Sequence, residues 1–396
     1  MEWKEVLLSE FLEFNPKRTI KKNEVARKIT MDLLIPHSKQ IYSFKYEPYT
    51  GGAKFSNGDT IMARITPCLE NGKHAYVSCL NEGEIAYGST EYIVLCGKNG
   101  VSDNEFVYYL SHTPQFVNTA IKSMVGSSGR QRAQVPVLEN LIMPVPVNLS
   151  DQRKIAGILS ALDAKIENNN KINANLESQA QALFKSWFVD FTPFKDQPFV
   201  DSELGPIPQG WKVGKLGDIA LQSTEKVLTR NDVKVLSPIT TGKLVLSEEY
   251  FTKQVFSKSI RNYKIVKQGA FAYNPARVNI GSLGMNEFKF DGCVSPVYVV
   301  FECLKGYSFF FDLFRKTEFF KQAVISFAIG GVRQTLNYSD FALIDATIPP
   351  LNIVQSFNEI YLHLKKKISI NEEENQRLAA LRDTLLPKLM SGEIKL

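Results

Sequence analysis

Two short loops of this sequence place an arginine next to a glutamine, two side chains well suited to hydrogen bonding with nucleic acids. The loops read "GSSGRQRAQV" and "AIGGVRQTLN", so Arg130-Gln131 and Arg333-Gln334 lie 203 positions apart. Arginine can bind guanine through O6 and N7, and glutamine can bind adenine through N6 and N7. Two loops that recognise different base sequences should carry different base-contacting residues, whereas these two pairs are identical. We therefore expect them to contact phosphates rather than bases.

Other candidates for DNA contact are expected to differ between the two loops and their surroundings. Arg132 has no counterpart in the second loop, where Thr335 stands, so it is freer to specify bases. We expect Arg64, Asn274 and Arg277 to face a DNA groove, because they lie at the ends of Gly-led apolar segments. The alternative is structural. Arginines in such loops also bond backbone carbonyls or a carboxylate, and polar strand ends are often simply solvated.

The sequence lacks the common catalytic motifs. It contains no GxxxxGK[ST] phosphate loop, no HExxH and no GxSxG. The stretch "YNPARVN" (273–279) lacks the second proline and the aromatic residue of an amino-methyltransferase motif. The four histidines are too scattered in the chain to predict a metal site. These observations favour a protein that reads DNA over one that catalyses a reaction.

The elements that position these residues occur twice in the chain. The strand-like stretch "STEYIVL" (89–95) matches "SPVYVVF" (295–301), and β-branched and aromatic runs of this kind predict buried strands. In each half there follow a helical stretch, the Arg-Gln loop and a proline-containing exit segment that leaves the globular part, residues 142–152 and 346–355. The order predicts two similar globular domains of mixed α/β (α+β) structure, related by a pseudo-twofold axis.

A long helical segment follows each exit, with a heptad seam that we expect to form an antiparallel two-helix coiled coil. Asn169 and Asn173 lie at the same seam positions as Asn371 and Asn375, with apolar residues on both sides. A polar seam residue reduces stability but fixes register. The alternative is that each helix packs on its own domain. The predicted domains are residues 1–148, a spacer helix 149–190, residues 191–350 and a C-terminal spacer helix 351–396.

Composition is compatible with these expectations. The chain has 396 residues, 44% of them hydrophobic, and a net charge of +6, which permits nucleic-acid binding without requiring it. No apolar run reaches the length of about 18 residues that a membrane helix needs, so no membrane partner is expected. Five cysteines form no CxxC pair, which indicates reduced thiols in the cytoplasm.

The duplicated motifs together resemble the specificity subunit of type I restriction-modification systems. The resemblance rests on motifs that occur in both halves: a tryptophan at the start (Trp3 and Trp211), a glycine-rich Arg-Gln loop similar to "G-x-x-R-Q", and a "P-x-P" or "P-P" segment before the long helix. The stretches "YNPARVNIGSLG" and "LLPKLMSGEIKL" add to it. It covers essentially the whole chain, and its specificity comes from the duplication in one order.

This resemblance implies a non-catalytic subunit whose two globular domains each recognise one half of a bipartite double-stranded DNA target. It also implies that the helices set the gap between the half-sites and dock DNA methyltransferase subunits, and that a restriction and translocation subunit completes the complex. S-adenosylmethionine, ATP and Mg²⁺ would then bind to those partner subunits. Two alternatives remain open: a scaffold whose two domains bind proteins, and a fused restriction-methylation enzyme.

Overall fold

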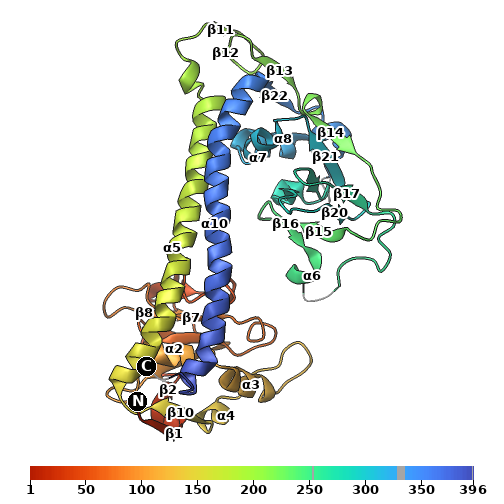
Figure 1. Ribbon diagram of the computed structural model, residues 1–396. Coiled ribbons are helices and arrows are strands. Elements are labelled where there is room, and N and C mark those ends of the chain that lie inside the picture. Colours follow the sequence, from red (N-terminus) through yellow and green to blue (C-terminus); the bar gives the residue numbers. More distant parts are fainter. Residues whose placement is uncertain (252–253, 328–334, 395) are drawn as a thin grey trace. The chain divides into compact units, whose positions relative to one another are not determined.

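The computed structural model describes residues 1–251, 254–327, 335–394 and 396. Its chain folds into two compact units (Figure 1). Unit 1 comprises Met1–Ile172 together with Ile370–Leu396, and unit 2 comprises Asn173–Ser369. Each unit therefore contains one globular part and a portion of both long helices. The division into the four predicted domain segments stays a prediction.

The globular part of unit 1 is built from ten strands and four short α-helices among its described residues. In chain order its elements are β1 (Trp3–Leu7), α1 (Leu8–Phe11), β2 (Leu12–Phe14), β3 (Val25–Ile29), η1 (Met31–Leu33), β4 (Lys45–Pro48), β5 (Lys54–Ser56), β6 (Thr60–Ala63), β7 (His74–Tyr76), β8 (Ile85–Gly88), β9 (Tyr92–Gly97), α2 (Asn104–Leu110), α3 (Pro114–Lys122), α4 (Val135–Glu139) and β10 (Ile142–Pro146). They form two four-stranded sheets, β2-β9-β6-β7 and β4-β3-β8-β5, and the pair β1-β10.

Unit 2 has the following elements: η2 (Thr192–Phe194), β11 (Phe199–Val200), β12 (Ile207–Pro208), β13 (Lys212–Lys215), η3 (Leu216–Asp218), β14 (Ala220–Ser223), β15 (Lys234–Pro238), β16 (Leu244–Leu246), α6 (Ser247–Tyr250), β17 (Lys264–Val266), β18 (Phe271–Tyr273), η4 (Val278–Ile280), β19 (Leu283–Met285), β20 (Gly292–Val294), β21 (Val299–Cys303), α7 (Ser308–Phe314), α8 (Glu318–Phe327), α9 (Tyr338–Phe341) and β22 (Asp345–Ile348). Its sheets are β14-β21-β18-β19 and β16-β15-β20-β17, with the pairs β13-β22 and β11-β12.

The two units repeat the same topology. Sheet β2-β9-β6-β7 corresponds strand for strand to β14-β21-β18-β19, and β4-β3-β8-β5 corresponds to β16-β15-β20-β17. The second sheet contains one parallel pair in each unit, β3 with β8 and β15 with β20. The predicted duplication and the mixed α/β character are thus confirmed, because even the single parallel pairing recurs.

Two long helices, α5 (Leu149–Phe188) and α10 (Leu351–Met390), run antiparallel within each unit (Figure 1). In unit 1, Asn169 bonds Asn375 and Asp163 bonds Arg382, so ascending positions on α5 meet descending positions on α10. In unit 2, the ring of Phe357 contacts those of Phe184 and Phe188. The predicted antiparallel coiled coil is therefore confirmed.

Each unit anchors its portion of the helix pair in a hydrophobic core. In unit 1, Ile155 and Leu159 of α5 join Leu389 of α10 and the buried helix α2. In unit 2, Phe184 and Phe357 join a large cluster of phenylalanines from α7 and the central sheet. Truncating one buried phenylalanine of this kind to alanine typically costs about 3–5 kcal/mol. The cores thus fix each globular part on the rod-like helices.

Candidate nucleic-acid interface

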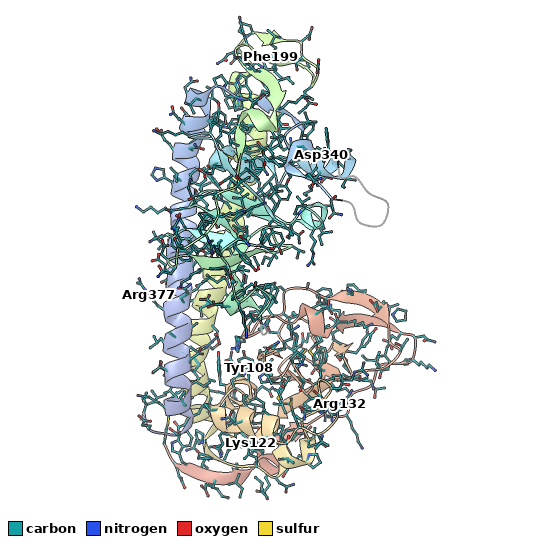
Figure 2. All side chains as sticks on the ribbon, turned by 90° about the vertical axis from the view of Figure 1, so that its right-hand side faces the viewer. Tyr108, Lys122, Arg132, Phe199, Asp340 and Arg377 are labelled. Carbon is teal, nitrogen blue, oxygen red and sulfur yellow. The ribbon has the colours of Figure 1, made fainter. Side chains whose placement is uncertain are left out.

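The first Arg-Gln loop lies in unit 1 between α3 and α4. It runs from Lys122 to Arg132, both labelled in Figure 2, and residues 126–130 are exposed. The backbone amide of Thr66 donates to the carbonyl oxygen of Gln131 over 3.0 Å, which fixes the base of the loop to the turn after β6. Arg130 stays exposed at the tip, where a phosphate could reach it.

Arg132 has a carboxylate partner. Its Nη2 lies 2.7 Å from Oε1 of Glu91, and its Nε lies 2.9 Å from Oε2 of the same residue. Its Nη1 also donates to the carbonyl oxygen of Arg130 over 3.2 Å. The hydrogen bonds from Arg132 lower the pKa of Glu91. The structural alternative therefore holds for Arg132, and base reading by this residue stays a prediction that requires the ion pair to open.

Arg64 lies beside this ion pair. Its amide donates to the carbonyl oxygen of Glu91 over 2.9 Å, and its own carbonyl accepts from Ala133 over 2.8 Å. The Nε of Arg64 is buried without a partner among the described residues. The structure thus brings Arg64, Gln131 and Arg132 together at one loop base, although DNA contact by them stays a prediction.

In unit 2, the corresponding turn follows β18 and carries Asn274 and Arg277. The side-chain oxygen of Asn274 accepts from the amide of Ala276 over 3.1 Å, while Arg277 is exposed. The amide of Leu336 donates to the carbonyl oxygen of Pro275 over 3.1 Å, so this described residue is bonded to the turn. Arg333 and Gln334 themselves lie outside the described residues.

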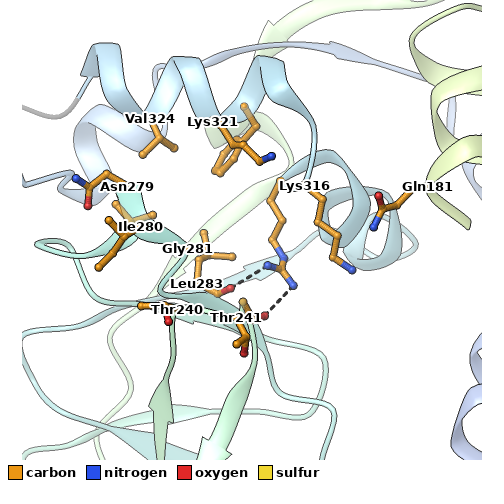
Figure 3. Close-up of a pocket in the computed structure, with 14 residues that line it drawn as sticks. Gln181, Thr240, Thr241, Asn279, Ile280, Gly281, Leu283, Lys316, Lys321 and Val324 are labelled. Atoms are coloured by element: carbon orange, nitrogen blue, oxygen red, sulfur yellow. Dashed lines mark hydrogen bonds between the residues drawn. The ribbon is translucent and has the colours of Figure 1, made fainter. Parts of the chain in front are cut away.

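A cavity of about 460 Å³, lined by both polar and apolar residues, lies beside the same turn in unit 2 (Figure 3). Arg315, directly after α7, lines the cavity and donates to the carbonyl oxygens of Leu283 and Gly242 over 2.9 and 3.0 Å. Glycine is required at position 281, with φ +93°, because a Cβ there would lie 2.5 Å from the carbonyl oxygen of Thr240. The two bonds from Arg315 hold the turn at Gly242 and strand β19 in a fixed relation.

Two cations that line this cavity, Arg315 and Lys316, form ion pairs with the buried carboxylate of Asp312. Arg315 and Lys316 lie 2.6 and 3.2 Å from Asp312. Burial alone would raise the pKa of Asp312, but these two cations lower it, to about 2. Asp312 is therefore ionised at neutral pH and orients both side chains, which leaves the cavity polar and cationic at its rim.

Three of the four predicted seam asparagines are buried in the helix pair, and the fourth, Asn375, is partly exposed. Asn169 is 1% exposed and donates to Oδ1 of Asn375 over 2.9 Å and to Glu374 over 2.7 Å. Asn173 and Asn371 are 9% and 1% exposed. Buried amides that bond each other favour one alignment of two helices over its neighbours. That these asparagines fix the register stays a prediction.

Sequence reasoning missed two groups of residues. Asp163 and Arg382 form a buried ion pair between the long helices, for which the only signal was a charged residue at a seam position. His74 and His112, predicted to be scattered, lie with ring centroids 4.7 Å apart. No cluster of three or more metal-ligating side chains is found among the described residues.

Comparisons with known proteins agree with the duplicated fold. Residues 1–178 match the family model of the type I restriction modification DNA specificity domain. The chain is 30% identical over 314 residues to the MjaIX specificity subunit of Methanocaldococcus jannaschii, covering 75% of this chain and 70% of that protein. The HindI specificity subunit of Haemophilus influenzae is 22% identical, with 90% of each protein covered.

A solved structure extends the agreement to the whole fold. The type I restriction-modification S subunit from M. genitalium superposes with a TM-score of 0.52 over 98% of this chain and 96% of that one, at 15% identity. In the described part of the chain, no helix is long and apolar enough to cross a membrane. With both the repeat and the relatives in agreement, this chain belongs to the family of type I restriction enzyme specificity subunits.

Proposed function

We propose that this chain is the DNA-recognition subunit of a type I restriction-modification complex, and that each unit recognises one half of a bipartite DNA target. The observation that carries this proposal is the strand-for-strand repeat of two sheets in units 1 and 2. A duplicated reader suits a target with two parts. Differences between the loops of the two units, such as Arg132 against Thr335, suit two different half-sites.

The long helices act in this proposal as a spacer between the two half-sites. A helix rises about 1.5 Å per residue, so its length is set by the residue count and cannot adapt to the DNA. The bonds between Asn169 and Asn375 and between Asp163 and Arg382 hold the pair in one register in unit 1. A rigid pair of fixed length accounts for a fixed gap between half-sites.

The helices also provide docking positions for DNA methyltransferase subunits. Ile158 on α5 and Ile360 on α10 occupy equivalent positions, 202 residues apart, and remain 37% and 43% exposed. An apolar side chain exposed at the same place in both repeats favours two copies of one partner. A restriction and translocation subunit completes the assembly in the cytoplasm.

Chemistry is assigned here to the partner subunits. The methyltransferase subunits bind S-adenosylmethionine, and the restriction subunit binds ATP and Mg²⁺. This chain contributes recognition and geometry and is itself non-catalytic. The support for this assignment is family membership together with the absence from the sequence of the common catalytic motifs.

A domain exchange tests the proposal. Residues 12–141 would be replaced by the equivalent segment of the MjaIX relative, and the methylated sequence mapped in cells that also express the methyltransferase partner. We expect one half of the recognised sequence to change and the other half and the gap to persist. A change in both halves, or in neither, would refute independent reading by the two units.

A further inference from the structure

The outer face of sheet β4-β3-β8-β5 in unit 1 differs sharply from its counterpart in unit 2. Strand register places Lys45 opposite Lys28, Lys28 opposite Tyr87, and Lys54 opposite Tyr87. Residues in register across a sheet point to the same face. Three lysines therefore form a row across four strands, with Tyr87 between Lys28 and Lys54. We call this the lysine row.

The equivalent row in unit 2 is apolar. There, Val235 pairs with Cys293, and Cys293 pairs with Ile265. All three are buried in a small hydrophobic cluster that also contains Tyr263, with Phe256 packed against it. Val235, Cys293 and Ile265 occupy the sheet positions that Lys28, Tyr87 and Lys54 occupy in unit 1.

Two connections of unit 2 contribute to this difference. The segment between β14 and β15 supplies Val227 and Val233 to the cluster. In unit 2, the connection from β16 to β17 supplies Phe256, Ile260 and Tyr263 to the cluster that covers this face. The two strands are labelled in Figure 1. In unit 1, only residues 49–53 join β4 to β5. Unit 2 thus closes this face with its own chain. In unit 1, Tyr87 is buried on this face beneath the ring of Tyr49, and Lys28 and Lys54 lie beside these two rings.

The lysine row remains cationic and accessible. Lys45 is exposed, and the Lys28 side chain is 28% exposed although it lies 2.7 Å from Glu47. The hydrogen bond that Lys28 donates to Glu47 raises the pKa of Lys28. Lys54 lies over the ring of Tyr49, with 5.0 Å from Nζ to the ring centroid. Glu47 bonds Lys28, and the charge of Asp32 also acts on Lys45, so the three ammonium groups are balanced only in part by these two carboxylates.

Two further lysines extend the charge. Backbone bonds from Asn23 to Tyr49 and from Tyr49 to Glu24 place the turn containing Lys21 and Lys22 beside Tyr49. Both lysines are exposed. Neighbouring strands lie about 4.8 Å apart, so the whole row spans about 14 Å, and a Debye length of about 10 Å at 0.1 M salt lets its charges act together.

We propose that the lysine row of unit 1 binds the phosphate backbone of duplex DNA without reading sequence, and that the equivalent face of unit 2 does not. Lysine is a flexible point charge, which suits phosphate oxygens rather than the fixed edges of bases. The proposal rests on the proposed DNA-binding function. It adds an asymmetry, in which unit 1 supplies an electrostatic contact that unit 2 lacks.

The test uses the full chain assembled with its methyltransferase partner and a mixed-sequence duplex. Lys28→Gln, Lys45→Gln and Lys54→Gln would be combined, and the dissociation constant measured as a function of salt. Each lost phosphate contact lowers the salt slope by about 0.9, so the slope should fall by about 2.7. Between about 50 and 200 mM salt, the wild type should then lose about 40-fold more affinity than the variant.

Two controls separate charge from fold. The matched Lys→Arg triple keeps the charge and should keep the slope. Lys4→Gln, Lys98→Gln and Lys388→Gln remove the same charge from elsewhere in unit 1 and should reduce the slope far less. If the triple glutamine variant does not fold, the single exposed Lys45→Gln should still lower the slope by about 0.9.

The possible failures are distinguishable. If the wild-type assembly shows no salt-dependent binding to any duplex, the proposed function itself fails. If the wild type binds but the triple variant keeps its slope, only the lysine row proposal is overturned. A variant that loses its partner subunit while the DNA slope is unchanged would place an acidic protein surface on this face and overturn the proposal equally.

Discussion

Breaking the ion pair between Asp163 and Arg382 should destabilise unit 1 strongly. Arg382 Nη1 lies 2.7 Å from Asp163 Oδ1, and the Tyr109 hydroxyl donates to Asp163 Oδ2 over 2.6 Å. The side chain of Arg382 is 15% exposed and that of Asp163 is 8% exposed. Removing one member of a buried pair leaves the other charge without its partner, which typically costs about 3–5 kcal/mol.

The geometry ranks the two single variants. Asp163→Asn leaves Arg382 with Asp383 at 2.9 Å, but that carboxylate is 64% exposed and compensates by no more than about 1 kcal/mol. We therefore expect a loss of about 3 kcal/mol. Among the described residues, Arg382→Met leaves Asp163 with the Tyr109 hydroxyl as its one remaining partner, so the loss should lie toward about 5 kcal/mol.

The double variant gives the sharper result. Replacing both charges, with Asp163→Leu and Arg382→Met, removes the desolvation penalty along with the attraction. The remaining cost should be about 1–3 kcal/mol, from leaving the buried Tyr109 hydroxyl without its acceptor. Free energies of unfolding would be measured by urea titration. As a control, Lys154→Met breaks an exposed helix pair, 3.4 Å from Asp151, and should cost at most about 0.5 kcal/mol. Single losses below about 1 kcal/mol, or a double loss equal to their sum, would refute the reasoning.

Three further predictions concern pH, spacing and the first Arg-Gln loop. Burial lowers the pKa of His112 to about 4; because a free histidine titrates near 6.5, the unfolded chain takes up the proton first, and stability should be lost as pH falls from about 6.5 toward 4. The loss in the free energy of unfolding should reach about 2 kcal/mol at about pH 5. Urea unfolding midpoints measured at several pH values would show it. A His112→Phe variant whose stability depends on pH in the same way as that of the wild type would contradict this prediction. Removing one heptad from each helix, residues 165–171 and the facing residues 373–379, should shorten the recognised gap by about three base pairs, since seven residues rise about 10.5 Å. The gap would be measured by methylation mapping. An unchanged gap would show that the helices do not act as the spacer. Arg130→Ala should weaken binding to all duplexes equally and lower the salt slope by about 0.9, whereas a loss confined to one base pair would indicate base reading instead.

Periodicity and repetition made the architecture predictable from sequence. The seam positions of α5 and α10 recur every three or four residues, and the same pattern returns 202 positions later, so helix pairing and direction followed from local rules. Asn169 could be placed in the seam for the same reason, and it does bond Asn375.

Contacts between distant residues were not predictable in this way. Glu91 lies 41 positions from Arg132, and nothing local indicates that the two meet. His74 and His112 are separated by two strands and a helix, which bring their rings together only in the folded unit. The lysine row depends on the register of β4, β3, β8 and β5, and a shift of one residue would turn each lysine to the opposite face.

Methylation mapping of the wild-type chain tests the central claim most directly. The chain would be expressed with its methyltransferase partner in cells without other DNA methylation, and every modified position sequenced. The account predicts one motif with two specified halves separated by a gap of fixed length and unspecified sequence. A single continuous motif, or a gap that varies in length from site to site, would contradict it.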